Sequence, residues 1–303
     1  MYITPETIAK ACEDAGMRCV QVGSINNYGP DFQTFVEEYE KYNNKHPLTS
    51  YIIGFHAEYT CSKELLIKVA EHAKKNKAPV FTHNSETLKE VNECIERYGM
   101  TPTAFLDSLG MFEYGGGGYH CVHFTENDME IFKKHNMYVV TNPASNLKLA
   151  SGIAPINDIL KRNIPIAIGT DGPASNNCLD MFREMFLVTG LAKVREKDAS
   201  VVDGYEVLRM ATVNGAHAMG LMDCDILAPG KLADLIMIDM NQPNMQPINN
   251  VVKNIVYSGS KQNVIMTMIH GEILYENGRF YIDQPVSEIY EKANTIINRI
   301  KAE

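Results

Sequence analysis

Ionisable side chains stand at the ends of four short apolar segments, where they could bind a metal and transfer protons. His56 and His83 each end such a segment, and Glu86 follows three residues after His83. A third segment carries His120, and a fourth leads into a Gly-Thr-Asp-Gly sequence that contains Asp171. Burying ionisable groups costs several kcal/mol unless they are paired, so four strand ends in register are hard to explain by packing alone. This set of side chains is typical of a metal-dependent hydrolase.

Taken singly, each of these residues has an ordinary structural interpretation. A lone Asp in a loop after a strand more often caps a helix, and a lone His at a strand end more often satisfies a structural hydrogen bond. Alternation along a strand places His123 on the face opposite His120, so we expect it to pack outside the sheet. We interpret the remaining histidines as structural or surface residues: His46, His72, His135, His217 and His270.

The elements that must position these side chains alternate between strand and helix. Short apolar runs predict six strands, at 18–22, 51–55, 79–82, 119–122, 137–141 and 164–168. Helical periodicity lies between them, at 32–42, after an N-cap at Ser62, and at 87–98, 126–135, 179–194 and 205–219. We interpret the four glycines 115–118 as a flexible loop. Repeated strand–helix units of this kind predict a parallel α/β sheet, either a barrel or a doubly wound sheet.

The pattern changes after about residue 221. Four strands are predicted, at 235–239, 251–257, 264–270 and 272–275, with turn residues between them. A helical tail follows, from 286 to 301. The C-terminal part therefore reads as a small all-β portion followed by one helix.

Composition excludes several classes of partner. The 303 residues carry a net charge of −9, which gives no basic surface for nucleic acid or an anionic membrane. No apolar stretch approaches the ~20 residues needed to span a bilayer, and residues 1–16 read as an amphipathic helix without signal-peptide features. The seven cysteines form no CxxC pair, which predicts a cytoplasmic protein without a disulfide framework.

Five ordered motifs resemble those of the amidohydrolase superfamily, and most of all its branch of 5-methylthioadenosine/S-adenosylhomocysteine deaminases and chlorohydrolase-like relatives. They lie at 56–62, 83–87, 120–123, 142–152 and 169–177, with further matches at 210–220 and 229–235. The resemblance implies an α/β fold of the (β/α)8 TIM-barrel type. It also implies one divalent metal, usually zinc, and hydrolytic deamination of a small purine nucleoside-type substrate.

Matched motif by motif, the resemblance assigns a role to each strand-end residue. His83 and Asp171 would be metal ligands, and Asp171 would also activate the attacking water. Glu86 would bind the substrate and hand a proton to a ring nitrogen of the purine. His120 would polarise the reacting centre, and His56 would contact the substrate.

The sequence departs from the family pattern at the first metal-ligand motif. The family takes two ligands from a His-x-His pair on the first barrel strand, and this sequence contains no His-x-His. We count about six of eight barrel strands, so we expect an incomplete, N-terminally truncated barrel at 1–222. The C-terminal part of a small β-sandwich would then occupy 223–282, and a helical tail 283–303.

This departure leaves more than one functional hypothesis. We expect the isolated chain to bind its metal weakly or not at all and to be inactive. A partner fragment or a homo-oligomer could complete the barrel, since an open barrel exposes sheet edges. The alternatives are a non-catalytic fragment that serves as a binding or assembly partner, or an enzyme of the guanine deaminase or triazine hydrolase type.

Overall fold

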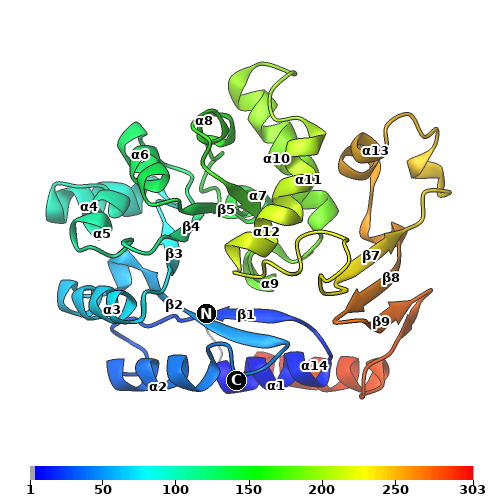
Figure 1. Cartoon of the computed structure of the whole chain (residues 1–303), viewed down its shortest axis with the longest axis horizontal. Coiled ribbons are helices and arrows are strands. Elements are labelled where there is room, and N and C mark those ends of the chain that lie inside the picture. Colours follow the sequence, from blue (N-terminus) through cyan, green and yellow to red (C-terminus); the bar gives the residue numbers. More distant parts are fainter. Residues whose placement is uncertain (1–3, 303) are drawn as a thin grey trace.

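Six parallel strands form one curled sheet, in the order β1-β2-β3-β4-β5-β6 (Figure 1). The computed structural model describes residues 4–302. The strands are β1 (Cys19–Val22), β2 (Thr49–Ala57), β3 (Val80–Asn84), β4 (Gly116–His120), β5 (Tyr138–Thr141) and β6 (Ile166–Ile168). This arrangement confirms the predicted α/β fold of the TIM-barrel type and the count of six strands.

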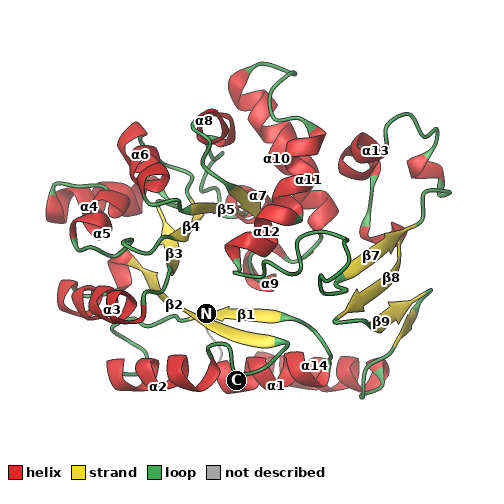
Figure 2. Cartoon of the chain, viewed as in Figure 1, coloured by secondary structure: helices red, strands yellow, loops and turns green. Residues whose placement is uncertain are grey.

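Helices alternate with the strands, and several of them cover the outer side of the curled sheet (Figure 2). They are α1 (Pro5–Asp14), α2 (Phe32–Tyr42), α3 (Lys63–Asn76), α4 (Leu88–Tyr98), α5 (Pro102–Ser108), α6 (Glu126–Lys134), α7 (Pro143–Lys148), α8 (Ile156–Lys161), α9 (Pro173–Asn176), α10 (Met181–Glu196), α11 (Gly204–Ala211) and α12 (Val213–Ala218). Ser62 caps α3 as predicted, because its Oγ accepts a hydrogen bond from the N–H of Leu65 at 3.2 Å. Fully buried Ile53 and Phe55 of β2 and Leu66 of α3 belong to the core between the two layers.

The two outer strands of the sheet do not pair with each other within residues 4–302. At β6 the Asn214 side chain donates a hydrogen bond to the backbone oxygen of Ile166 at 2.8 Å, which occupies part of the free edge. At β1 the strand pairs with β2 alone, and its residues line a cavity. Gln21 of β1 is 6% exposed, and neither polar atom of its side-chain amide has a hydrogen-bond partner among the described residues. Within residues 4–302, no further strand pairs with the outer edge of β1.

The glycine run is a strand and not a flexible loop, so the sequence-based prediction for it was wrong. Gly116, Gly117 and Gly118 form most of β4 and pair with Val80, Phe81 and Thr82 of β3. A Cβ on Gly116 would lie 1.9 Å from the backbone oxygen of Val80, and one on Gly117 would lie 2.5 Å from the Phe81 ring. Glycine is required here because the neighbouring strand and its side chains leave no space. The strand ends at His120 rather than continuing to residue 122, because His120 and Cys121 have positive φ angles that turn the chain.

A separate antiparallel sheet follows, with the order β10-β9-β8-β7. Its strands are β7 (Leu235–Ile238), β8 (Val264–Ile269), β9 (Glu272–Glu276) and β10 (Arg279–Phe280). The segment predicted as a strand at 251–257 is instead the helix α13 (Val251–Ser258), so that prediction was wrong. Its β-branched residues favour a strand, but Asn250 caps the helix, and the i, i+3, i+4 set Val252, Ile255 and Val256 packs on the core.

The chain ends in α14 (Val286–Ala302), which confirms the predicted helical tail. The domain boundaries at residues 222 and 282 stay predictions. No helix within residues 4–302 combines the length and apolar character needed to cross a bilayer.

Candidate active site

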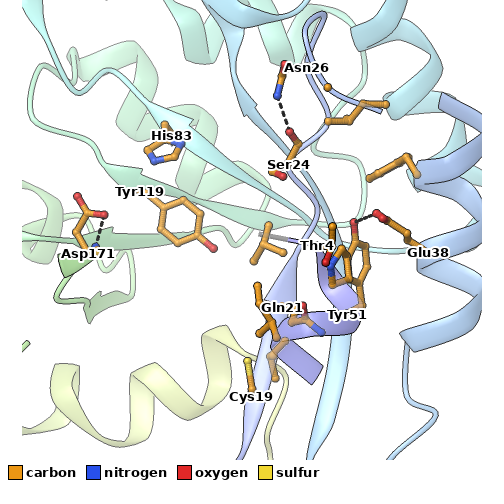
Figure 3. Close-up of a pocket in the computed structure, with 18 of the residues that line it drawn as sticks. Thr4, Cys19, Gln21, Ser24, Asn26, Glu38, Tyr51, His83, Tyr119 and Asp171 are labelled. Atoms are coloured by element: carbon orange, nitrogen blue, oxygen red, sulfur yellow. Dashed lines mark hydrogen bonds between the residues drawn. The ribbon is translucent and has the colours of Figure 1, made fainter. Parts of the chain in front are cut away.

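The strand-end residues gather at the carboxyl ends of β2, β3, β4 and β6. These strand ends surround the mouth of the curled sheet. A cavity of about 680 Å³ extends from the mouth along β1 and is lined by His83, Tyr119, His120 and Asp171 among others. Figure 3 shows His83, Tyr119 and Asp171 facing this cavity on one side of β1, with Gln21 and Tyr51 on the other. Carboxyl ends of parallel strands are where barrel enzymes place their chemistry.

His83 is held in the tautomer that leaves Nε2 free to bind a cation. Its Nδ1 lies 2.6 Å from the backbone oxygen of His56, and because a carbonyl can only accept, Nδ1 carries the proton. The His83 ring stacks on His120, with ring centroids 5.5 Å apart, and its centroid is 4.9 Å from that of His56. Burial, reinforced by His120, lowers the pKa of His83 to about 4, so the imidazole is neutral at pH 7.

Asp171 is held as an oriented carboxylate in the loop after β6. Its backbone has a positive φ of 59°, and its two oxygens accept hydrogen bonds from the Gly172 N–H at 2.6 Å and the Ser145 hydroxyl at 2.7 Å. Burial acts to raise the pKa of this carboxyl, but the bonds from Ser145, Ser175 and Gly172 outweigh it, so the pKa lies below its ordinary value. Asp171 is therefore ionised at neutral pH.

Glu86 and His120 face each other across the mouth. Glu86 Oε2 lies 3.8 Å from His120 Nε2, and Glu86 Oε1 accepts a hydrogen bond from the Ser151 hydroxyl at 3.2 Å. His120 is 1% exposed, and its Nδ1 lies 2.8 Å from Asn146 Oδ1. His56 Nδ1 lies 3.1 Å from Thr60 Oγ1, and burial lowers the pKa of this imidazole.

The structure thus brings all five predicted site residues to one mouth, while their roles stay predictions. Sequence analysis missed the residues that hold them, namely Ser145, Asn146 and Ser151, although all three lie in the motif at 142–152. It also missed Tyr119, whose ring centroid is 5.8 Å from that of His83.

His123 does not lie on a strand, so its predicted place on the outer face was wrong. Positive φ angles at His120 and Cys121 end β4 and turn the chain, which breaks the alternation on which that prediction depended. His123 Nε2 lies 2.8 Å from the backbone oxygen of Ser151, which places it beside the site.

Other histidines make structural contacts away from the mouth, as expected. His72 packs against Phe35 and Tyr39, with ring centroids 5.7 and 5.3 Å away. His135 pairs with Asp107 at 2.7 Å, and His217 with Asp225 at 2.9 Å.

Two donors at the mouth suit a divalent metal. The free Nε2 of His83 and the ionised carboxylate of Asp171 are ligand types that zinc accepts. Both are oriented by hydrogen bonds to a second group, as metal ligands usually are. Within residues 4–302, however, no group of three or more His, Cys, Asp or Glu side chains is arranged to hold a metal ion. His83 and Asp171 therefore fit as part of a coordination shell whose remaining positions need water or donors from outside these residues.

The sequence matches the model of the amidohydrolase family over residues 1–274. The chain belongs to the amidohydrolase family. A curated member, the 5-methylthioadenosine/S-adenosylhomocysteine deaminase of Caldanaerobacter subterraneus subsp. tengcongensis, is 37% identical over 311 residues. That match covers 98% of this chain and 71% of the relative.

Solved amidohydrolase structures share the fold. An adenosine deaminase from Xanthomonas campestris with bound zinc superposes with a TM-score of 0.93 at 30% identity, covering 100% of this chain and 71% of its own. The atrazine chlorohydrolase of Arthrobacter aurescens, also complexed with zinc, has a TM-score of 0.86 at 21% identity, with coverage of 96% and 68%. At that identity the likeness to the chlorohydrolase shows the fold alone. The structural neighbours of this amidohydrolase therefore include both a deaminase and a chlorohydrolase.

Glu90 is a buried carboxylic acid close to the mouth. It is 4% exposed, and burial raises its pKa to about 7, against the hydrogen bonds that it accepts from Glu86, Ser85 and Thr87. The charge of Glu86 also raises the pKa of Glu90, and the charge of Glu90 in turn raises the pKa values of Cys94 and Cys121. Burial raises the pKa of both thiols, that of Cys94 to about 12, so neither ionises near neutrality.

We expect Glu90→Gln to flatten the dependence of stability on pH between about 4.5 and about 7. In this window the folded protein keeps the Glu90 proton and the unfolded chain releases it, so the free energy of unfolding of the wild type falls as pH rises. The raised pKa corresponds to a contribution of up to ~3 kcal/mol across the window. Urea unfolding at several pH values measures it. Glu96→Gln, at an exposed site on the same helix, should keep the wild-type slope, and an unchanged slope in Glu90→Gln would contradict the assignment.

Proposed function

We propose that this amidohydrolase supplies most of the catalytic side chains for hydrolytic deamination of an adenine nucleoside such as 5-methylthioadenosine or S-adenosylhomocysteine. The observation that carries the proposal is that His83, His120 and Asp171, from the ends of three strands of one parallel sheet, line one cavity, while Glu86 Oε2 lies 3.8 Å from His120 Nε2. The identity to a curated deaminase of this class, over nearly the whole chain, supports the same reaction.

His83 and Asp171 would hold a divalent metal, with zinc the ion that neighbouring structures contain. When bound, such an ion lowers the pKa of water from ~15.7 toward ~7 and so supplies a nucleophile at neutral pH. Two side-chain ligands hold zinc weakly, because a firm site uses three or four. We therefore propose that donors from outside residues 4–302 complete the shell in the active form.

The other side chains then move protons and stabilise charge. The Asp171 carboxylate, ionised at neutral pH, can accept a proton from the attacking water. Glu86 can deliver a proton to a ring nitrogen of the purine, because a carboxyl group serves as acid or base according to its partner. His120 is buried and fixed by Asn146, so it can stabilise charge that develops at the attacked carbon.

The cavity suits a small-molecule substrate. Its volume of about 680 Å³ lies within the ~300–1,000 Å³ of typical ligand sites. His56, half-buried beside His83 on the neighbouring strand, would contact a bound nucleoside. A guanine deaminase or a triazine hydrolase would use the same metal site. A non-catalytic protein would carry the same side chains but turn over none of these substrates. Assays with the corresponding substrates distinguish these alternatives.

We expect the isolated chain to bind zinc weakly and to lose it on extensive dialysis against a mild chelator. Metal analysis should then find less than one zinc per chain. In a competition titration with a zinc indicator, His83→Ala should weaken the residual affinity about tenfold or more, since even loss of an outer-shell partner costs ~10–100-fold. His46→Ala, at an exposed histidine, is the matched control and should leave the affinity unchanged. One zinc retained per chain after dialysis would show that the ligand set is larger than proposed.

A further inference from the structure

Glu90 makes more contacts than a helix cap requires. In a capping box the carboxylate returns to the N–H of the N-cap residue, here Thr87, and that distance is 3.5 Å. The two shorter bonds go to residues before the helix, with Glu90 Oε1 accepting from Ser85 N–H at 3.0 Å and Oε2 from Glu86 N–H at 2.8 Å. The Glu90 carboxylate therefore accepts hydrogen bonds from three successive backbone N–H groups, those of residues 85–87.

This stretch is an unusual piece of backbone that needs such support. Ser85 is fully buried and has a positive φ of 50°, a conformation that L residues seldom adopt. Its hydroxyl donates to Asn84 Oδ1 at 2.9 Å, and its backbone oxygen accepts the N–H of His123 at 3.0 Å. Strained backbone persists where surrounding contacts fix it, and here they fix the residue directly before Glu86.

A second set of contacts, made by Ser151, holds the Glu86 side chain. Ser151 donates its hydroxyl to Glu86 Oε1 at 3.2 Å, and its backbone N–H donates to the oxygen of Asn146 at 2.8 Å. The backbone oxygen of Ser151 accepts from His123 Nε2 at 2.8 Å, so one histidine ties Ser151 and Ser85 together. Glu86 is thereby fixed at its backbone by Glu90 and at its carboxylate by Ser151.

We propose that Glu90 is a positioning residue, whose buried carboxylate fixes the backbone of residues 85–87 so that Glu86 meets Ser151 and His120. The inference rests on the proposed role of Glu86 in proton transfer, and it adds a residue that does not touch the substrate. A small displacement of a proton-transfer group lowers catalysis steeply, because reacting atoms must lie within hydrogen-bond reach. The ionised Glu90 carboxylate accepts the hydrogen bonds of the Ser85 and Glu86 N–H groups. Its burial makes ionisation unfavourable, so ionisation of Glu90 lowers the free energy of unfolding.

The first test needs no activity. Amide hydrogen exchange of the full 303-residue chain, followed by NMR, should show slow exchange at Ser85 and Glu86. In Glu90→Gln the exchange at these two amides should accelerate by about tenfold or more relative to Val91 in the following helix, while Glu96→Gln should change neither. Unchanged protection at residues 85 and 86 in Glu90→Gln would overturn the proposal.

The second test is a double-mutant cycle in the enzyme assembled with a polypeptide expected to supply further metal ligands, the part of the Xanthomonas campestris adenosine deaminase that this chain does not match. Glu90→Gln should lower kcat by roughly tenfold to a hundredfold with little change in KM, because a misplaced proton-transfer group costs up to ~10²-fold. In a Glu86→Gln background the same change should have almost no further effect, since Glu90 acts through Glu86. Additive losses would overturn the positioning role. An inactive assembled wild type would instead contradict the proposed function, and the exchange experiment would still decide the role of Glu90.

Discussion

Asp171→Asn is expected to lower kcat/KM for 5-methylthioadenosine by at least ~10³-fold in the assembled enzyme, that is, this chain together with a polypeptide that supplies further metal ligands. The amide keeps the size of the side chain, and its one oxygen can still accept the Gly172 N–H while its NH2 group donates to the Ser145 hydroxyl. The amide cannot accept a proton from water, and it is a poorer zinc ligand than the carboxylate that it replaces. Acid–base catalysis alone contributes ~10²–10⁴-fold, so the combined loss should exceed the effect of either role.

Steady-state rates of ammonia release measure this loss. Asp283→Asn makes the same chemical change at an exposed position in the segment before α14 and should retain the wild-type rate. A protein with Asp171→Asn that keeps more than a tenth of the wild-type kcat/KM would exclude Asp171 as ligand and proton acceptor. Retained activity would also require another group at the mouth to take both roles.

Complementation is expected to convert an inactive chain into an active enzyme. The sheet offers an edge for added strands, because β1 pairs on one side alone among the described residues. The part of the Xanthomonas campestris adenosine deaminase that this chain does not match is a defined polypeptide to add. We expect a complex on size-exclusion chromatography and zinc-dependent turnover of an adenine nucleoside. A stable complex without turnover would favour the non-catalytic alternative.

The parts of the fold that were predicted correctly depend on local patterns. Hydrophobic periodicity and the Ser62 cap located most helices, and apolar runs located five of the six strands to within a few residues. The glycine strand was missed because the need for glycine arises from Val80 and Phe81 on a neighbouring strand, which no local pattern shows. The helix α13 was missed for a related reason, since tertiary packing of Ile255 and Val256 overrides the strand propensity of its β-branched residues.

The site was predicted through its ionisable residues and not through the groups that hold them. A strand end is visible in sequence, so the convergence of residues such as His83 and Asp171 followed from the parallel sheet. The contacts of Ser145 and Ser151 depend on how the loop after β5 folds over the mouth, which depends on long-range packing. The place of His123 could not be deduced, because positive φ angles at two preceding residues break the strand alternation.

The most direct measurement is zinc-dependent ammonia release from 5-methylthioadenosine, S-adenosylhomocysteine and adenosine by the isolated 303-residue chain. The chain holds the side chains that would orient a purine, but we expect His83 and Asp171 alone to hold zinc too weakly to keep an activated nucleophile at neutral pH. We therefore predict no release above the background of the zinc-containing buffer, and release once the added polypeptide completes the site. Zinc-dependent release by the isolated chain that is lost in Asp171→Asn would contradict this account, because it would mean that residues assigned here to structural roles complete the metal site.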